Sequence, residues 1–215
     1  MEIDHIYIFS QQNGAEAQHL VEAGFVEGSS RRHVGQGTQN RKFYTKDFFL
    51  EILWAVEVSE LHSPVVRETT LLERSQFIQS GYSRFGMCLV NTPETDELFK
   101  DAMAYQPAYF PQGMYIDMLV SHEFPALPLI FRLPFQGKKV PANEPMNHSN
   151  GIERLSQAIF SVPELVLGVP LLKHFESHPQ VSFQVGDRPS LKLLFDEGKG
   201  GNTWKDEALD LVIAY

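Results

Sequence analysis

A strand, a helix and three further strands are predicted in residues 1–56, and this order of elements recurs twice later in the 215-residue chain. Residues 2–9 are rich in β-branched and aromatic side chains. Residues 15–23 hold helix formers, and Gly24 stands where a helix C-cap is expected. A second strand is expected from Phe25, a third at residues 38–45 and a fourth at residues 48–56. The pattern predicts a module with the order βαβββ.

Two later segments, residues 82–135 and 148–215, repeat this order with few identical residues. We therefore expect an α+β fold in which repeated βαβββ modules form a curved mixed sheet with helices on its outer face. In this organisation residues 1–135 form a pair of modules, 1–56 and 82–135, and residues 148–215 form a third. The elements expected after residue 56 are strands at 84–91, 114–121, 127–133, 181–185, 190–195 and 209–214, and helices near 70–79, 94–105 and 164–175.

Charge and cysteine content restrict the partners and the compartment. A formal net charge of −9 argues against nucleic acid, because binding to phosphates depends on Lys and Arg. The one cysteine, Cys88, lies in an apolar run and fits a reducing compartment. The sequence has no signal peptide pattern and no apolar stretch of about 20 residues, the length of a membrane span. We expect a cytoplasmic protein whose partners are a small-molecule substrate or ligand and, as one option, a second copy in a homodimer.

Strand alternation places one imidazole and one carboxylate among apolar groups. In residues 3–9 the face that carries His5 comprises Ile3, His5, Tyr7 and Phe9, and the opposite face comprises Asp4, Ile6 and Ile8. In the fourth strand Glu51 shares a face with Phe49 and Leu53. Unpaired charges are costly to bury, so His5 and Glu51 need a partner. That partner is each other, a metal, or water in a cavity, and a purely structural buried pair remains an alternative.

These residues stand in segments that resemble the glyoxalase-like branch of the vicinal-oxygen-chelate superfamily. The resemblance rests on Ile3-Asp4-His5-Ile6, on His33 with Gly37-Thr38-Gln39-Asn40, on Phe49-Leu50-Glu51-Ile52-Leu53 and on Asn147-His148-Ser149-Asn150-Gly151. The last segment looks like a His-Pro-Asn-Gly element of such chains, with Ser149 in place of proline.

The resemblance implies that His5 and Glu51 are two ligands of a divalent metal (Zn, Ni, Mn or Fe), or the catalytic pair of a site without metal. The second module has Gly86 near the position of His5 and residues 129–131 near that of Glu51, so it supplies no evident ligand. If modules one and three pair, His148 and Asp210 are candidates for the missing ligands.

The resemblance also implies that His33, Thr38, Asn40, His148 and Asn150 bind the substrate. The aromatic content of the first module adds Tyr7 and Phe49, which we expect to line an apolar pocket. Turn-forming composition gives an alternative explanation for two of these segments. Gly35 and Gly37 suit a simple turn between strands, and the segment around His148 and Asn150 has the composition of an exposed turn.

Two functions remain open at this point. The first is an enzyme, a metal-dependent lyase, isomerase or dioxygenase, in which His5 and Glu51 act on a carbonyl or enediol-like substrate. The second is a non-catalytic protein that binds or sequesters a small apolar or cationic molecule without metal. The missing ligands of the second module favour the binder, and the retained His5 and Glu51 favour the enzyme.

Overall fold

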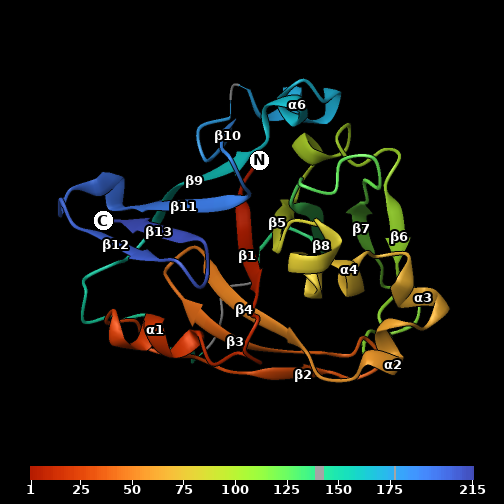
Figure 1. The fold of residues 1–215 in the computed structure, drawn as a ribbon, viewed down its shortest axis with the longest axis horizontal. Helices are drawn as coiled ribbons and strands as arrows, with labels where there is room; N and C mark the ends of the chain where they lie inside the picture. Colours follow the sequence, from red (N-terminus) through yellow and green to blue (C-terminus); the bar gives the residue numbers. More distant parts are fainter. Residues whose placement is uncertain (139–142, 177) are drawn as a thin grey trace.

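Two β-sheets, of eight and five strands, make up the fold (Figure 1). The computed structural model describes residues 1–138, 143–176 and 178–215. Within these residues, no helix has the length and apolar character required to cross a membrane.

The first half of the large sheet has the predicted βαβββ order. Its elements are β1 (Ile3–Phe9), α1 (Ala17–Glu22), β2 (Arg31–His33), β3 (Thr38–Tyr44) and β4 (Phe49–Ala55). The strands lie in the order β1-β4-β3-β2, with β1 parallel to β4 and the other neighbours antiparallel. The strand that the sequence predicts from Phe25 begins later, at Arg31.

The second half repeats the arrangement after a group of short helices. These are α2 (Val58–Leu61), α3 (Pro64–Arg67), α4 (Leu71–Ser75) and α5 (Phe77–Ser80), followed by β5 (Phe85–Asn91), η1 (Pro93–Thr95), β6 (Met103–Tyr105), β7 (Ile116–Leu119) and β8 (Leu129–Gln136). The strand order β5-β8-β7-β6 copies the first half, and β1 joins β5 in antiparallel pairing. The two modules thus form one curved mixed sheet, as the sequence predicts.

The prediction of a helix at residues 94–105 is wrong. Only the short η1 forms there, and the end of the segment is β6, which pairs with β7. Leu98 and Phe99 are nevertheless buried in the core. The segment therefore anchors itself by these two side chains and completes the sheet edge instead of continuing as a helix.

The small sheet holds the C-terminal part of the chain. Its elements are β9 (Leu155–Val162), α6 (Glu164–Leu167), η2 (Pro170–Phe175), β10 (Val181–Val185), β11 (Ser190–Phe195), η3 (Asp196–Gly198), β12 (Thr203–Asp206) and β13 (Leu211–Ala214). β9 is parallel to β10, β11 is parallel to β13, and β9 and β11 are antiparallel. β1 and β5 have the same relationship, so the small sheet is a shortened version of the large one. Among the residues that the structure describes, it shares no strand pairing with β1, so modules one and three lie in separate sheets.

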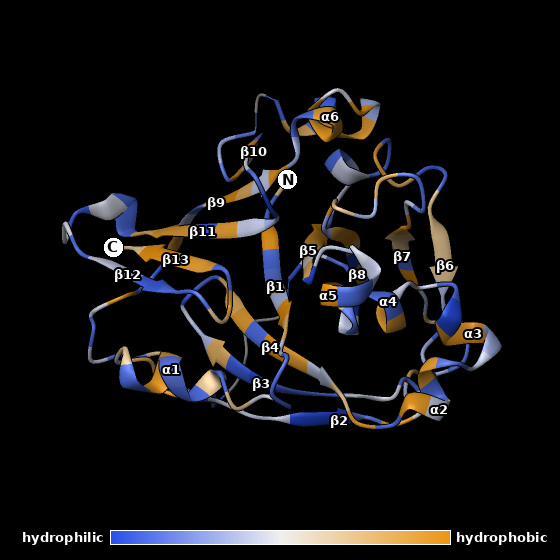
Figure 2. Ribbon diagram, in the orientation of Figure 1, coloured by the Kyte–Doolittle hydropathy of each residue, from blue (hydrophilic) through white to orange (hydrophobic). Residues whose placement is uncertain are grey.

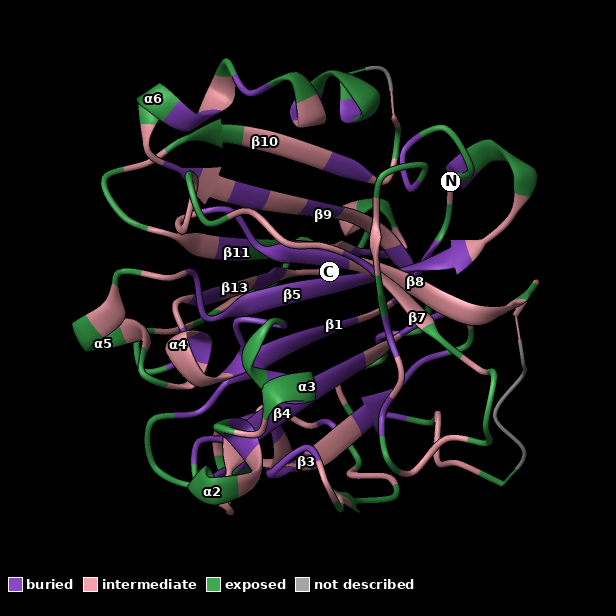
Figure 3. Cartoon of the chain, turned by 90° about the vertical axis from the view of Figure 1, so that its right-hand side faces the viewer, coloured by how far each residue is buried: buried purple, intermediate pink, exposed green. Residues whose placement is uncertain are grey.

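The outer face of the large sheet is covered by α1 and by the small sheet together. Ala17 and Leu20 of α1 belong to the same buried cluster as Ile6 and Ile52. The small sheet reaches that cluster with Phe160, whose ring lies 6.3 Å from the ring of Phe85. Strands β11 and β13 are accordingly rich in apolar residues (Figure 2), and β1 and β5 are buried along most of their length (Figure 3). This packing leaves the opposite, concave face of the large sheet for a site.

A register shift at the start of β1 changes the predicted alternation. The pairing of β1 with β5 shifts between Ile3 and His5, so Ile3 lies in the core with Ile6 and Ile8. The prediction that Ile3 shares the face of His5 is wrong, because a bulge turns the strand at this point. Beyond the bulge the alternation holds, and Tyr7 faces the concave side.

Candidate functional site

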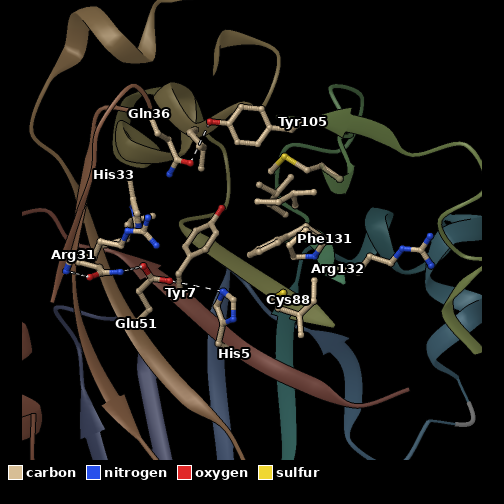
Figure 4. Close-up of a pocket in the computed structure, with 18 of the residues that line it drawn as sticks. His5, Tyr7, Arg31, His33, Gln36, Glu51, Cys88, Tyr105, Phe131 and Arg132 are labelled. Atoms are coloured by element: carbon tan, nitrogen blue, oxygen red, sulfur yellow. Dashed lines mark hydrogen bonds and ion pairs between the residues drawn. The ribbon is translucent and has the colours of Figure 1, made fainter. Parts of the chain in front are cut away.

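A cavity of about 230 Å³ lies on the concave face of the large sheet (Figure 4). We call it the cup. Residues from both halves of the chain line it. Those that precede β5 are His5, Tyr7, Arg31, His33, Gln36, Asn40, Lys42, Phe49, Glu51, Leu53 and Leu71. Those from β5 onward are Cys88, Tyr105, Tyr109, Phe110, Ile116, Met118, Leu129, Phe131, Arg132, Leu133 and Pro134. Six of the residues predicted from the sequence, His5, Tyr7, His33, Asn40, Phe49 and Glu51, thus meet in one cavity.

His5 is held on three sides. Its Nδ1 lies 2.7 Å from Oδ2 of Asp4, and its ring stacks on Phe49 at 4.4 Å between centroids. The ring of Phe131 meets it edge-on at 5.5 Å. Since a carboxylate only accepts hydrogen bonds, Nδ1 carries a proton, and in the neutral imidazole Nε2 is then the acceptor. The bulge in β1 makes this contact with the adjacent residue feasible, because regular alternation would send Asp4 to the other face.

Glu51 lies opposite the free nitrogen of His5. Its Oε2 is 3.9 Å from Nε2, as expected from the neighbouring positions of β1 and β4. Its Oε1 accepts a hydrogen bond from Nδ2 of Asn40 at 2.5 Å, and Oδ1 of Asn40 accepts one from the backbone N–H of Arg31 at 2.7 Å. Asn40 therefore fixes the carboxylate, and Oε2 remains available to a ligand.

The hydroxyl of Tyr7 is a polar group without a partner. It is buried in the lining of the cup, and no described residue hydrogen-bonds it. Burial raises the pKa of Tyr7, so the hydroxyl keeps its proton and can donate it to a ligand. Figure 4 shows it directed away from His5, toward the side of the cup where Gln36 and Tyr105 lie. Burial likewise raises the pKa of the Cys88 thiol, which is therefore uncharged and inert.

The loop after β6 closes one rim of the cup. The hydroxyl of Tyr109 donates to Oε1 of Gln36 at 3.0 Å, and its ring stacks on His33 at 5.2 Å. Gly35, at φ +82°, lets Ala108 approach to a distance that a Cβ would forbid. Burial lowers the pKa of His33, so this imidazole is neutral. The sequence offers no signal for Tyr109 or Gln36, because neither belongs to a motif.

Four predicted residues do not line the cup. His148 is buried elsewhere, where Nδ1 accepts from the N–H of Val26 at 2.9 Å and Nε2 donates to the carbonyl of Tyr44 at 2.7 Å. The amide of Asn150 donates to the carbonyl of Ala23. Asp210 pairs with Arg84. Thr38 is buried beneath His33, with Oγ1 2.9 Å from its Nδ1.

The donors at the cup do not complete the metal site that the resemblance implies. Ile6 faces Met87 across β1 and β5, so Gly86 corresponds to His5, and Phe131 of β8 corresponds to Glu51 of β4. Neither residue has a donor side chain. Two protein ligands remain, whereas catalytic zinc sites use three. Asp4, His5 and Cys88 form a second group, with ligand atoms within 4.8 Å of one another. There, however, Asp4 already bonds Nδ1 of His5.

Comparison with known proteins gives similarity in structure alone. No protein-family model and no curated protein matches the sequence. A hypothetical protein from Staphylococcus aureus has a similar structure, with TM-score 0.59 and 10% identity over 99% of this chain and 97% of its own. A mutant of 4-hydroxymandelate synthase from Streptomyces coelicolor matches at TM-score 0.46 and 11% identity over 99% of this chain and 61% of its own. A fusion of a xylose isomerase-like TIM barrel with 4-hydroxyphenylpyruvate dioxygenase matches at 0.45 and 12%, over 99% and 31%. The similarity to the Staphylococcus aureus protein extends over both chains and shows a shared fold, and the strand order of the large sheet is consistent with a fold of vicinal-oxygen-chelate type.

Proposed function

We propose that this chain is a glyoxalase-like protein that binds a small organic molecule in the cup and moves a proton between atoms of that molecule. His5 is the proton acceptor. The observation that carries the proposal is the position of its imidazole, whose Nδ1 is bonded to Asp4 at 2.7 Å while Nε2 faces the cup. An imidazole oriented by a carboxylate, with its second nitrogen free, is the usual form of a general base.

The other polar groups of the cup fit the same reaction. A C–H proton next to a carbonyl passes to Nε2 of His5, and the electron pair moves onto the carbonyl oxygen. The buried hydroxyl of Tyr7 is a donor for that oxygen, because it has no partner among the described residues. Return of the proton to the same carbon exchanges it with solvent. Where that carbon also bears a hydroxyl, return of the proton to the former carbonyl carbon completes an isomerisation, because the hydroxyl oxygen gives up its proton and becomes the new carbonyl while the former carbonyl oxygen becomes a hydroxyl. Glu51, held by Asn40, faces Nε2 and stabilises the imidazolium that forms in between.

A metal is not part of this proposal. A divalent ion bound by His5 and Glu51 would polarise a carbonyl, but the corresponding positions of the second half, Gly86 and Phe131, add no ligand. Proton transfer by His5 needs none. Binding without turnover is the second candidate, and the apolar wall formed by Phe131 and Met118 favours it, because such a wall holds a ligand but performs no chemistry.

Hydrogen exchange in D₂O separates these functions. 2-Oxohexanoate and 2-hexanone carry exchangeable C–H groups beside a carbonyl, and loss of their proton NMR signals reports proton transfer. We expect the protein to accelerate exchange of at least one probe and His5→Gln to reduce the rate at least about 100-fold, within the usual contribution of a general base. His62→Gln, at an exposed position, is the matched control and keeps the rate. Binding of both probes without exchange would contradict the catalytic role and favour the binder.

A further inference from the structure

The two walls of the cup differ in polarity. The wall from the first half carries the charged groups, which are Arg31, Lys42 and Glu51, together with His5 and His33. The wall from the second half is mainly apolar and includes Phe131, Met118 and Leu129. Figure 4 shows the contrast between Arg31, His33 and Glu51 on one side and Phe131 on the other. A ligand that satisfies both walls has one polar end and one apolar end.

Two cations of the polar wall form no salt bridge with a carboxylate among the described residues, although Glu144 is close enough to Lys42 for their charges to interact. The guanidinium of Arg31 rests over the ring of Tyr109, 4.7 Å from its centroid, and Nζ of Lys42 lies 5.4 Å from that of Tyr44. Arg132, at the edge of the other wall, differs because Asp117 and Asp96 bind it at 2.8 and 2.7 Å. Cations resting on aromatic faces are positioned by the protein but keep their charge for another partner.

The lining of the cup carries more positive than negative side chains. Glu51 is the one carboxylate among its described lining residues, against Arg31 and Lys42, while His5 is hydrogen-bonded to Asp4 and burial lowers the pKa of His33. Arg132 is already compensated. Arg31 and Lys42 together exceed Glu51 by one positive charge in the lining, in a chain whose net charge is −9. A local charge opposite to that of the whole protein is a selective feature for a ligand.

We infer that the ligand is a small amphiphilic monoanion, with its carboxylate or equivalent singly charged group at Arg31 and Lys42 and its apolar body against Phe131 and Met118. This inference rests on the proposed function only in taking the cup as the ligand site. The cavity volume of about 230 Å³ favours a body no larger than a single ring or a short chain, because pockets that bind drug-sized ligands have volumes of about 300–1,000 Å³.

Three probes with one body and different charges test the inference. They are 3-phenylpropanoate, 3-phenylpropan-1-ol and 3-phenylpropylamine, with affinities measured by isothermal titration calorimetry. The acid should bind at least about tenfold more tightly than the alcohol, and the amine most weakly. The preference for the acid should fall as salt is raised, because Arg31 lies exposed at the mouth, where counterions screen its charge.

Substitutions of Arg31 and Lys42 test whether these two cations cause the preference for the acid. Arg31→Met and Lys42→Met should each weaken the acid about tenfold and leave the alcohol within about twofold. Arg32→Met is the matched control, since Arg32 is the exposed neighbour of Arg31 and does not line the cup. Equal binding of acid and alcohol would overturn the inferred ligand charge and leave the cup as a ligand site. Failure of all three probes to bind would contradict both the inference and the proposed function.

Discussion

The ring of Tyr7 occupies the space that a side chain at Gly86 would fill. The two residues face each other across β1 and β5, and a Cβ at position 86 would lie 2.0 Å from Cε1 of Tyr7. Position 86 corresponds to that of His5 in the first half. The second half thus has no ligand side chain at this position. The ring of Tyr7 fills the space instead, and its hydroxyl reaches the cup.

Gly86→Ala should therefore destabilise the protein. The new methyl group forces the buried ring of Tyr7 toward the cup, and overpacking of this kind costs about 1–3 kcal/mol. Urea unfolding measures the loss, and the affinity for 3-phenylpropanoate should fall with it. Gly168→Ala is the control, because a Cβ there has no atom within 4 Å. Equal stability of both variants and the wild type would show that Tyr7 does not depend on the absent side chain.

Tyr7→Phe should separate stability from function. Removing a buried hydroxyl without a partner relieves an unfavourable burial, so we expect the free energy of unfolding to rise by about 1 kcal/mol. Proton exchange of a bound ketone should slow at least about tenfold, because its oxygen loses a donor. Tyr105→Phe should have the opposite effect on stability, since that hydroxyl donates to Gln36. A loss of stability in Tyr7→Phe would mean that the hydroxyl has a partner.

The sequence predicted the parts of the site that depend on local alternation. Phe49 and Glu51 face the cup because β4 is a regular strand, and Tyr7 follows the same rule. Asp4 could not be placed with His5, because the bulge that brings them together arises from the pairing of β1 with β5. Alternation within one strand carries no information about such a shift.

Contacts between distant segments could not be predicted either, because they too depend on how separate parts of the chain pair. Tyr109 and Gln36 meet only after the two halves of the sheet join, and neither stands in a periodic pattern. Strand β12 was not predicted, because Thr203 and Lys205 are exposed and polar and give it no apolar pattern. His148 has the surroundings of a turn in the sequence, yet it is buried, because Val26 and Tyr44 supply hydrogen bonds to both ring nitrogens.

Acid should destabilise the protein through His148. Burial lowers its pKa below the ordinary 6.5, and the N–H of Val26 opposes a second proton on Nδ1. The unfolded chain therefore binds more protons below pH 6.5, so stability is complete above that value and is lost as the pH falls toward the lower folded pKa. Burial of His33 and His178 acts in the same direction.

Urea unfolding between pH 8 and pH 5 measures this dependence. His148→Ala should be less stable than the wild type at pH 8, because it loses two buried hydrogen bonds, and should show a shallower loss on acidification. His62→Ala, at an exposed position, should keep the slope of the wild type. A wild-type slope in His148→Ala would assign the acid sensitivity to other groups.

The position of the ligand tests the account most directly, and two methionines on opposite faces of the large sheet report it. Met118 lines the cup, whereas Met87 is packed in the core behind the sheet. In a protein labelled at the methionine methyl groups, titration with 3-phenylpropanoate should shift the Met118 resonance to saturation and leave that of Met87 unchanged. Saturable binding with an unchanged Met118 resonance would place the ligand elsewhere and contradict the assignment of the cup as the functional site.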